Sequence, residues 1–335
     1  MSDNWTVDWR VIVDGVDLTD KMRPYLISVR VTDQDGEASD SCQLTLDDNG
    51  GRLKMPRTRR EVQVIADGAR LFLGLVDSVR STGTKAKSGR LLRVTAKGFD
   101  TEGRAKEPLR FHRDDATLQD FLGAAAQYAG LSGIKVHPAL ASIERDYWVA
   151  DAESFLQVGQ RLAREFDATF KIRGDRAVLV PRGQNVGLGT IRAVVGQNVV
   201  SWSIAPVLGR PRQRASRTLF FDRAAGGHQV AEREIEGAAD AVTLARAPVA
   251  DRGQADDVNA GRASKAKRDG GEGSITMDWT PEAQAEAPIT LSGARTGIDG
   301  LYVIRSTDKS FDKNGGSVTA VQVKRPEDGA GKDER

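Results

Sequence analysis

The chain has 335 residues, which is enough for two or three domains. Its 49 basic and 47 acidic side chains give a net charge of +2, which argues against a strongly basic nucleic-acid binder. A single cysteine, Cys42, excludes an intramolecular disulfide and a thiolate metal cluster. No secretory signal opens the sequence and no apolar run could span a membrane, so we expect a protein that is made in the cytoplasm and does not insert into membranes.

Short strands separated by turns dominate the first 100 residues. The strand-like segments are 9–13, 26–33, 41–46, 61–66, 71–80 and 90–99. Turn dipeptides such as Asp14-Gly15 and Asp67-Gly68 separate them. This spacing predicts a β-barrel or sandwich for residues 1–100, in which Cys42 is a small buried residue.

The pattern changes to mixed α/β between residues 101 and 182. Thr117 can cap a helix that ends near Gly130, and Asp114-Asp115 before it is interpreted as part of the cap. Residues 136–148 are predicted to be a polar connector. A helix followed by a short β segment occurs twice, at 117–137 and at 152–180, which is a weak internal repeat.

The second of these units has the clearest pattern in the chain. Ser154 and Gln157 fit a capping box, and Phe155, Val158, Leu162 and Phe166 form one apolar helix face. Residues 168–173 and 176–181 alternate around Gly174-Asp175, with Lys171 on the side away from the apolar residues. This pattern predicts an amphipathic helix followed by a β-hairpin.

Strand signals resume in residues 183–326 after a Gly-containing linker at 183–189. The strand-like segments are 199–204, 213–222 paired with 229–235, 273–279, 288–291, 301–311 and 317–324. We expect 237–259 to be an exposed loop or partly disordered, and 258–268 to be a short helix of small residues. The charged residues 327–335 are expected to be a mobile tail. The fold class predicted is therefore α+β and β-dominated, with two antiparallel β-barrel domains, 1–100 and 183–326, around an α/β insert, 101–182.

No pattern of catalytic or ligand-binding residues stands out. His112, His137 and His228 lack metal-ligand spacing, and the sequence contains no nucleophile elbow, phosphate loop or zinc-protease helix. The carboxylate pairs Asp47-Asp48, Asp114-Asp115 and Asp256-Asp257 lie in turn, cap or loop contexts. We therefore predict no catalytic, cofactor-binding or metal-binding residues, and no cofactor.

Two basic runs, 54–60 and 210–217, could contact phosphates. They lack neighbouring aromatic side chains for base stacking, so a solvated or protein-contacting loop is the favoured interpretation.

Three segments in order resemble the late control protein D family of phages, the baseplate hub proteins of contractile tails. The first combines the Val13-Asp14-Gly15 turn, the run 36–47 and the strand 71–76. The second is the helix and hairpin at 154–180. The third is Asp299-Gly300 with the strand 301–304, followed by 314–316 and 318–323. Asp308 stands where many members carry His, at a structural position.

The resemblance implies a homotrimer whose two pseudo-equivalent β domains per chain present six similar modules to a six-fold tail tube. Its partners would be the tail tube protein and the central spike protein, and possible further partners are the tape-measure protein and the baseplate wedge proteins. No enzymatic activity is implied, nor sequence-specific binding of nucleic acid, although DNA could pass through the lumen. The location implied is the virion baseplate, with assembly in the host cytoplasm. The related VgrG proteins carry a spike on the same chain; here we expect a separate spike polypeptide.

The rival hypotheses are a baseplate-attached cell-wall hydrolase, the hub of a secretion-system or extracellular injection spike, and a DNA-binding regulator. Near-zero net charge and the lack of a helix-turn-helix pattern disfavour the last. Because cargo must pass through a ring, we also expect both basic runs to lie off the inner wall or to be paired with carboxylates.

Overall fold

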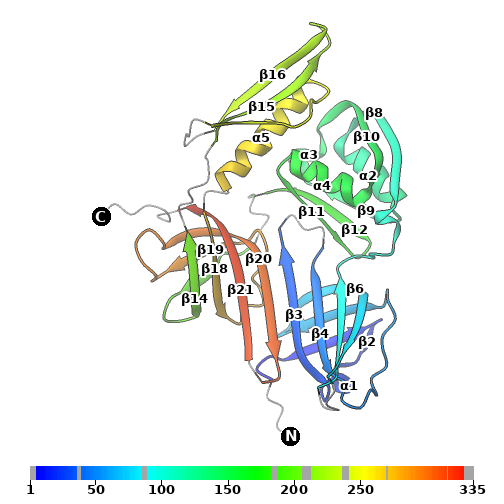
Figure 1. Ribbon diagram of the computed structural model, residues 1–335, viewed down its shortest axis with the longest axis vertical. Helices are drawn as coiled ribbons and strands as arrows, with labels where there is room; N and C mark the ends of the chain where they lie inside the picture. The colour runs from blue at the N-terminus through cyan, green and yellow to red at the C-terminus, as the bar shows by residue number, and fades with distance from the viewer. Residues whose placement is uncertain are drawn as a thin grey trace.

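The computed structural model describes residues 5–35, 39–84, 89–182, 188–205, 213–235, 241–268, 271–314 and 316–327. The largest element of the fold is one 13-stranded sheet built from both ends of the chain. Figure 1 shows its two halves side by side, the insert above the N-terminal half, and a third unit projecting at the top. The prediction of a β-dominated α+β fold with two antiparallel β halves and an α/β insert is confirmed.

The N-terminal module contains β1 (Trp9–Val13), β2 (Val16–Asp17), α1 (Thr19–Met22), β3 (Leu26–Gln34), β4 (Ser41–Asp47), β5 (Glu61–Ala66), β6 (Ala69–Thr82) and β7 (Leu91–Lys97). The C-terminal module contains β13 (Ile191–Val194), β14 (Val199–Ala205), β18 (Glu272–Asp278), β19 (Pro288–Ser292), β20 (Gly300–Asp312) and β21 (Gly316–Glu327). Each module has its own core of alternating apolar residues, the first around Trp9 and the second around Tyr302.

The two modules are internal duplicates. The strand order is β3-β4-β7-β6-β5-β1 in the first module and β14-β18-β21-β20-β19-β13 in the second, so strands correspond one to one in chain order. The bulge between Leu26 and Ser28 recurs between Val199 and Ser201, and the bulge after Val76 recurs after Ile304. The modules differ in the direction of the strand at the end of each strand order: β1 is antiparallel to β5, whereas β13 is parallel to β19.

The insert comprises η1 (Arg104–Lys106), β8 (Pro108–Thr117), α2 (Leu118–Tyr128), β9 (Gly133–Val136), α3 (Pro138–Ala141), β10 (Glu144–Ser154), α4 (Phe155–Glu165), β11 (Ala168–Arg173) and β12 (Arg176–Pro181). The predicted capping box is present: Gln157 N–H donates to Ser154 Oγ, and Ser154 N–H donates to Gln157 Oε1 at 2.8 Å. The apolar faces of α2 and α4 meet in one core with Phe170 and Ile172 of the predicted hairpin.

The internal repeat within the insert is real. Helices α2 and α4 each have 11 residues, and their caps, Thr117 and Ser154, both accept a bond from a backbone N–H in the first turn. The strands that precede them pair antiparallel, with His112 opposite its repeat equivalent Val149. The insert therefore contains two strand–helix–strand units whose first strands pair with each other.

Some of the predictions for the insert are wrong. The segment predicted as a connector, 136–148, contains α3 and the start of β10. Asp114 and Asp115 lie within β8, and Thr117 alone caps α2. Strands β8 and β10 are exposed along much of their length, so they show little alternation, and their pairing with each other defines them.

The protruding module consists of β15 (Gln213–Asp222), β16 (Gly227–Glu234), β17 (Ala241–Leu244) and α5 (Arg252–Arg268). The predicted hairpin of 213–222 with 229–235 is confirmed by the β15–β16 pairing. The loop expected over 237–259 is wrong for its described part, since 241–244 form a strand and the helix begins at Arg252 rather than near 258. The buried Asn259 joins helix to sheet: its Oδ1 accepts from Ser216 and Thr218, and its Nδ2 donates to the Ala231 carbonyl. Residues 183–187 of the linker expected at 183–189, and residues 328–335 of the tail expected at 327–335, lie outside the described residues.

Candidate functional site at the module seam and the free sheet edges

The two modules meet where β20 pairs with β3. Residues 306–312 lie opposite residues 28–34 in an antiparallel register. Val29 and Phe311 face each other across this seam and are 0% and 1% exposed. Asp308, the position where the resembled family carries His, forms an ion pair with Arg30 at 3.2 Å. The seam therefore makes one continuous wall out of two modules.

Buried lysines converge on this seam from different parts of the fold. Lys171 of β11 in the insert forms ion pairs with Asp33 of β3 and with Asp40 at 2.8 Å. It lies on the side of the strand away from the apolar residues, as the alternation predicts, but the N-terminal module covers that side and buries it.

The C-terminal module contributes the other two lysines. Lys324 of β21 is paired with Asp35 and with Glu286 at 2.9 Å. Lys309 of β20 donates to the Pro281 carbonyl at 2.5 Å. Because a buried charge without a partner is costly, these contacts fix the insert and both modules in one arrangement.

The carboxyl groups of this cluster have shifted pKa values. Burial raises the pKa of Asp33, but the Lys171 ammonium and the Ala285 N–H lower it further, so the net shift is downward. Asp35 follows the same pattern with Lys324. The pKa of Asp40 is raised, first by burial and then by the Asp33 charge, against which Lys171 and Arg173 act. The lowered pKa values keep Asp33 and Asp35 ionised at neutral pH, beside Lys171 and Lys324.

A cavity of about 270 Å³ borders the cluster between the hairpin and residues 284–286. Asp33, Lys171 and Glu286 line it, together with the apolar Val178 and Val180. All three charged groups already have ion partners. Asp33 pairs with Lys171, which also pairs with Asp40, and Glu286 pairs with Lys324. The arrangement therefore joins domains and presents no unpaired group of the cluster to a ligand.

β14 and the C-terminal half of β6 are edge segments of the large sheet, each with a partner strand on one side only within the described part of the chain. β14 pairs with β18 along its length, and its other side forms only an isolated bridge between Val195 and Val199 among the described residues. The C-terminal half of β6 pairs with β7 only. Val200 and Trp202 on β14 are 61% and 41% exposed.

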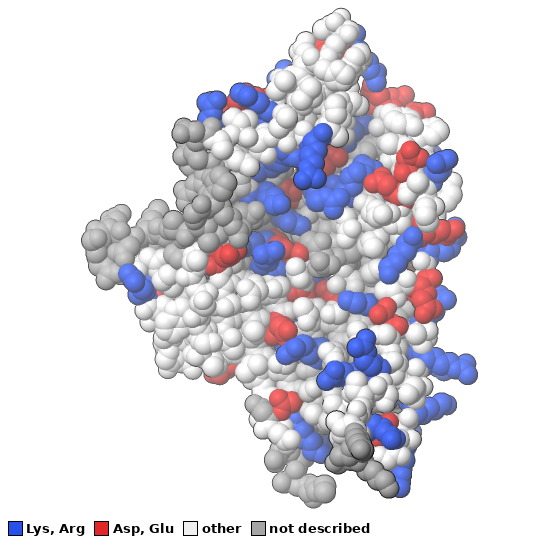
Figure 2. Space-filling view, in the orientation of Figure 1, with Lys and Arg blue, Asp and Glu red and all other residues white. Residues whose placement is uncertain are grey.

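In Figure 2 the surface over β14, β18 and β21 carries few charges, whereas the N-terminal half carries both signs. Depletion of charge is typical of contact surfaces.

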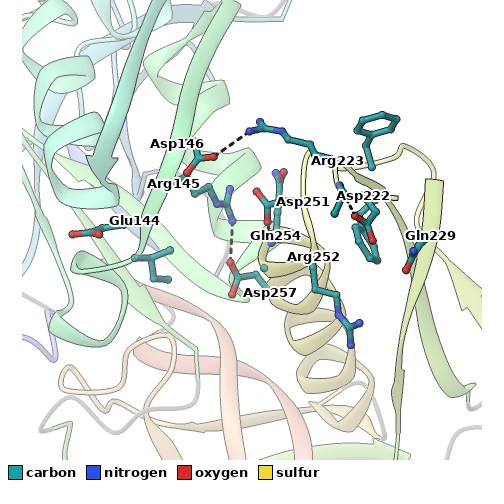
Figure 3. Close-up of a pocket in the computed structure, with 15 residues that line it drawn as sticks. Glu144, Arg145, Asp146, Asp222, Arg223, Gln229, Asp251, Arg252, Gln254 and Asp257 are labelled. Carbon is teal, nitrogen blue, oxygen red and sulfur yellow. Dashed lines mark hydrogen bonds and ion pairs between the residues drawn. The ribbon is translucent and has the colours of Figure 1, made fainter. Parts of the chain in front are cut away.

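A cleft of about 770 Å³ separates the insert from the protruding module. Figure 3 shows Arg145 and Asp146 of β10 reaching toward Asp257 of α5 and toward Arg223. Arg145 donates to Asp257 at 3.0 Å and to Glu165 at 2.6 Å, and its guanidinium lies 4.3 Å from the Trp148 ring centroid. Deeper along α5, Gly261 packs so closely that a β-carbon there would collide with the Glu165 carbonyl. The insert and the protruding module are therefore held together along this cleft by the contacts of Arg145 and Gly261.

We predict that R145K lowers the free energy of unfolding by about 1.5 to 3 kcal/mol, since an ammonium cannot bond two carboxylates and stack on an aromatic ring in the same geometry. Urea denaturation followed by tryptophan fluorescence measures this change. The matched control is R223K, because Arg223 bonds Asp146 at 3.4 Å with both side chains more than 70% exposed. The control should stay within about 0.5 kcal/mol of wild type. Equal losses in both variants would contradict the role of Arg145.

The histidines and carboxylate pairs examined in the sequence are not brought together. His112 stacks on Tyr147, His137 caps α3 through Nδ1, and His228 contacts Phe221. The carboxylates of Asp47 and Asp48 accept backbone bonds in their own turn. Among the described residues no group of three or more His, Cys, Asp or Glu could hold a metal ion.

The basic runs carry ion pairs at several positions. Arg59 pairs with Asp100 at 2.6 Å, Arg60 pairs with Asp14, and Arg217 pairs with Glu232 at 2.7 Å. The first residues of the second run, 210–212, lie outside the described residues. None of the helices in the described part of the chain has the length and apolar composition needed to cross a bilayer.

Neither a protein-family model nor a curated protein matches this sequence. Solved structures match over nearly the whole chain. A tail protein from Neisseria meningitidis has a TM-score of 0.73 and 14% identity, covering 97% of this chain and 98% of that chain. The 43 kDa tail protein of prophage MuSo2 from Shewanella oneidensis has a TM-score of 0.74 and 14% identity, covering 96% and 99%. An E. coli component of the type VI secretion system has a TM-score of 0.59 and 9% identity, covering 92% and 76%. The chain therefore has the fold of phage tail proteins, in agreement with the resemblance to baseplate hubs seen in the sequence.

Proposed function

We propose that this chain is the structural hub of a phage or phage-like contractile tail. Three copies form a ring that adapts the six-fold tail tube to the three-fold central spike. The ring belongs to the baseplate of the virion and assembles in the host cytoplasm. In this proposal the functional domains are 1–100, 101–182 and 183–326, as expected from the sequence.

The observation that carries the proposal is the internal duplication within one open sheet. Two modules with the same strand order and the same bulges lie side by side, so three copies supply six similar modules to a six-fold partner. The insertions differ, because one follows β7 whereas the other interrupts the connection from β14 to β18. Features outside the sheet would therefore repeat three times around the ring, as a three-fold partner requires.

Native mass spectrometry of the full chain tests the ring, with a trimer of 36.2 kDa subunits as the expected result. Purified tails should contain the chain together with tube and spike proteins. A monomer that never enters assembled tails would overturn the proposal.

A secretion-system hub is the second candidate, favoured by the likeness to the E. coli type VI component over 92% of this chain. The identity of the tube protein that co-purifies separates the two. For the rival hydrolase, incubation of the isolated chain with peptidoglycan is expected to release no fragments.

A further inference from the structure

We infer that β14 of one copy pairs antiparallel with the C-terminal half of β6 of a neighbouring copy, and that Trp202 of the first copy packs over Gly83 of the second. This inference rests on the proposed function in one respect, namely that copies of the chain associate. It adds the strands, the register and the anchoring side chain of the contact.

The pairing follows from the duplication. β14 corresponds to β3 and β6 corresponds to β20, and within the chain β3 pairs with β20. Each module thus has one edge of the β3 type and one of the β20 type. Within the chain the β3 edge of the first module pairs with the β20 edge of the second, which leaves one of these two edges in each module without a partner strand among the described residues. The unused pair is β14 and the end of β6, which can meet only between two copies because they lie at opposite sides of the joined modules. Such a head-to-tail contact closes into a ring.

The register follows from the equivalent pairs. Ser306 corresponds to Ser78, since each comes after the same bulge opposite the last strand of its module. Ser28 likewise corresponds to Ser201. The seam pair of Ser310 with Arg30 therefore predicts Thr82 opposite Ser203 between copies. The next pair, Phe311 with Val29, predicts Gly83 opposite Trp202.

The side chains at the second pair complement each other in volume. Within the chain a large residue on β20, Phe311, covers a small one on β3, Val29. Between copies the large residue is on the β3-type strand, Trp202, and the residue opposite is glycine. A β-carbon built at Gly83 meets nothing within 4 Å, so there is room beside it for an indole ring. Trp202 is 41% exposed in the single chain, whereas its counterpart Val29 is fully buried.

The hydrogen-bond pattern identifies which pairs can be cross-linked. Across the seam Asp35 N–H donates to the Arg305 carbonyl at 2.8 Å, and Lys313 N–H donates to the Ile27 carbonyl at 2.9 Å. Since bonded pairs alternate along an antiparallel ladder, Arg30 with Ser310 is a non-bonded pair, and so is its equivalent Ser203 with Thr82. Non-bonded pairs bring the α-carbons within disulfide range.

The experiment uses the full chain with Cys42 kept, because burial raises the pKa of that thiol to about 12 and leaves it unreactive. Equimolar T82C and S203C single variants are mixed, oxidised and separated without reductant. The expected product is a covalent dimer, and the T82C/S203C double variant should form a covalent ring. The matched control is R80C with S203C, a diagonal pair about 7–8 Å apart, which should cross-link at least tenfold more slowly.

A second measurement tests the anchor. W202A is expected to weaken association at least tenfold, whereas F221A should leave association unchanged, because Phe221 is equally exposed, at 42%, but lies on the protruding module. Trimers that form without the T82C–S203C cross-link would overturn this inference and leave the proposed hub standing. A chain that stays monomeric even within purified tails would overturn both. An unchanged affinity in W202A would overturn the role of Trp202.

Discussion

Replacing Lys171 with methionine is expected to lower the free energy of unfolding by about 3–5 kcal/mol, the cost of leaving buried charges without their partner. Lys171 is 8% exposed and lies between the carboxylates of Asp33 and Asp40. Methionine fills a similar volume but neutralises neither group, so the two carboxylates would repel each other in a site with little water. Urea unfolding at pH 7 measures the loss.

The control for K171M is K135M, since Lys135 lies on an exposed position of β9 in the same insert. Its expected change is within about 0.5 kcal/mol. A triple variant, K171M with D33N and D40N, removes the buried charges of the contact and leaves only Arg173, whose side chain is 59% exposed. It should regain most of the loss, because neutral groups no longer need an ion partner. If K171M were as stable as K135M, the cluster would be hydrated and would not hold the insert in place.

The features that were predicted correctly depend on residues close together in the sequence. The capping box of Ser154 and Gln157 and the Gly174-Asp175 hairpin are complete within a few residues, so local chemistry defines them. The lysine cluster could not be found this way, because Lys324 and Asp35 are 289 positions apart. A buried lysine in an alternating strand looks like an exposed one until another domain covers it.

The resemblance implied two equivalent β domains, but the residues themselves show no repeat between them, for a related reason. Equivalent positions share a place in the ladder but not a residue type, as Val29 and Trp202 illustrate. Helix α5 was partly missed because small residues such as Ala255 and Ala263 form its buried face, which leaves no stripe of large apolar side chains. Gly261 and Asn259 fit that face through backbone contact and hydrogen bonds, and the sequence carries no periodic signal for either.

Acid is expected to destabilise the protein most steeply below about pH 4. The folded pKa values of Asp33 and Asp35 are lowered, so their ion pairs contribute stability above the unfolded pKa of about 3.9 and lose it as the pH falls through the folded values. Asp40 acts in the opposite direction, because its raised folded pKa lets the folded state bind a proton first. The effect of Asp40 lies above the unfolded pKa, whereas those of Asp33 and Asp35 lie below it, so the net slope below about pH 4 is a loss of stability.

The slope of the unfolding free energy between pH 4 and pH 2.5 separates this cluster from the general effect of acid. D35N removes one of the two protons taken up on unfolding, so its slope should be shallower by up to about 1.4 kcal/mol per pH unit. D146N is the control, since Asp146 is 79% exposed in its pair with Arg223, and its slope should equal that of wild type. A slope unchanged in D35N would mean that the Asp35–Lys324 pair does not control acid stability. The opposing shift at Asp40 makes a second check above this window, because D40N should remove the stability that the wild type gains as the pH falls from neutral toward about 4.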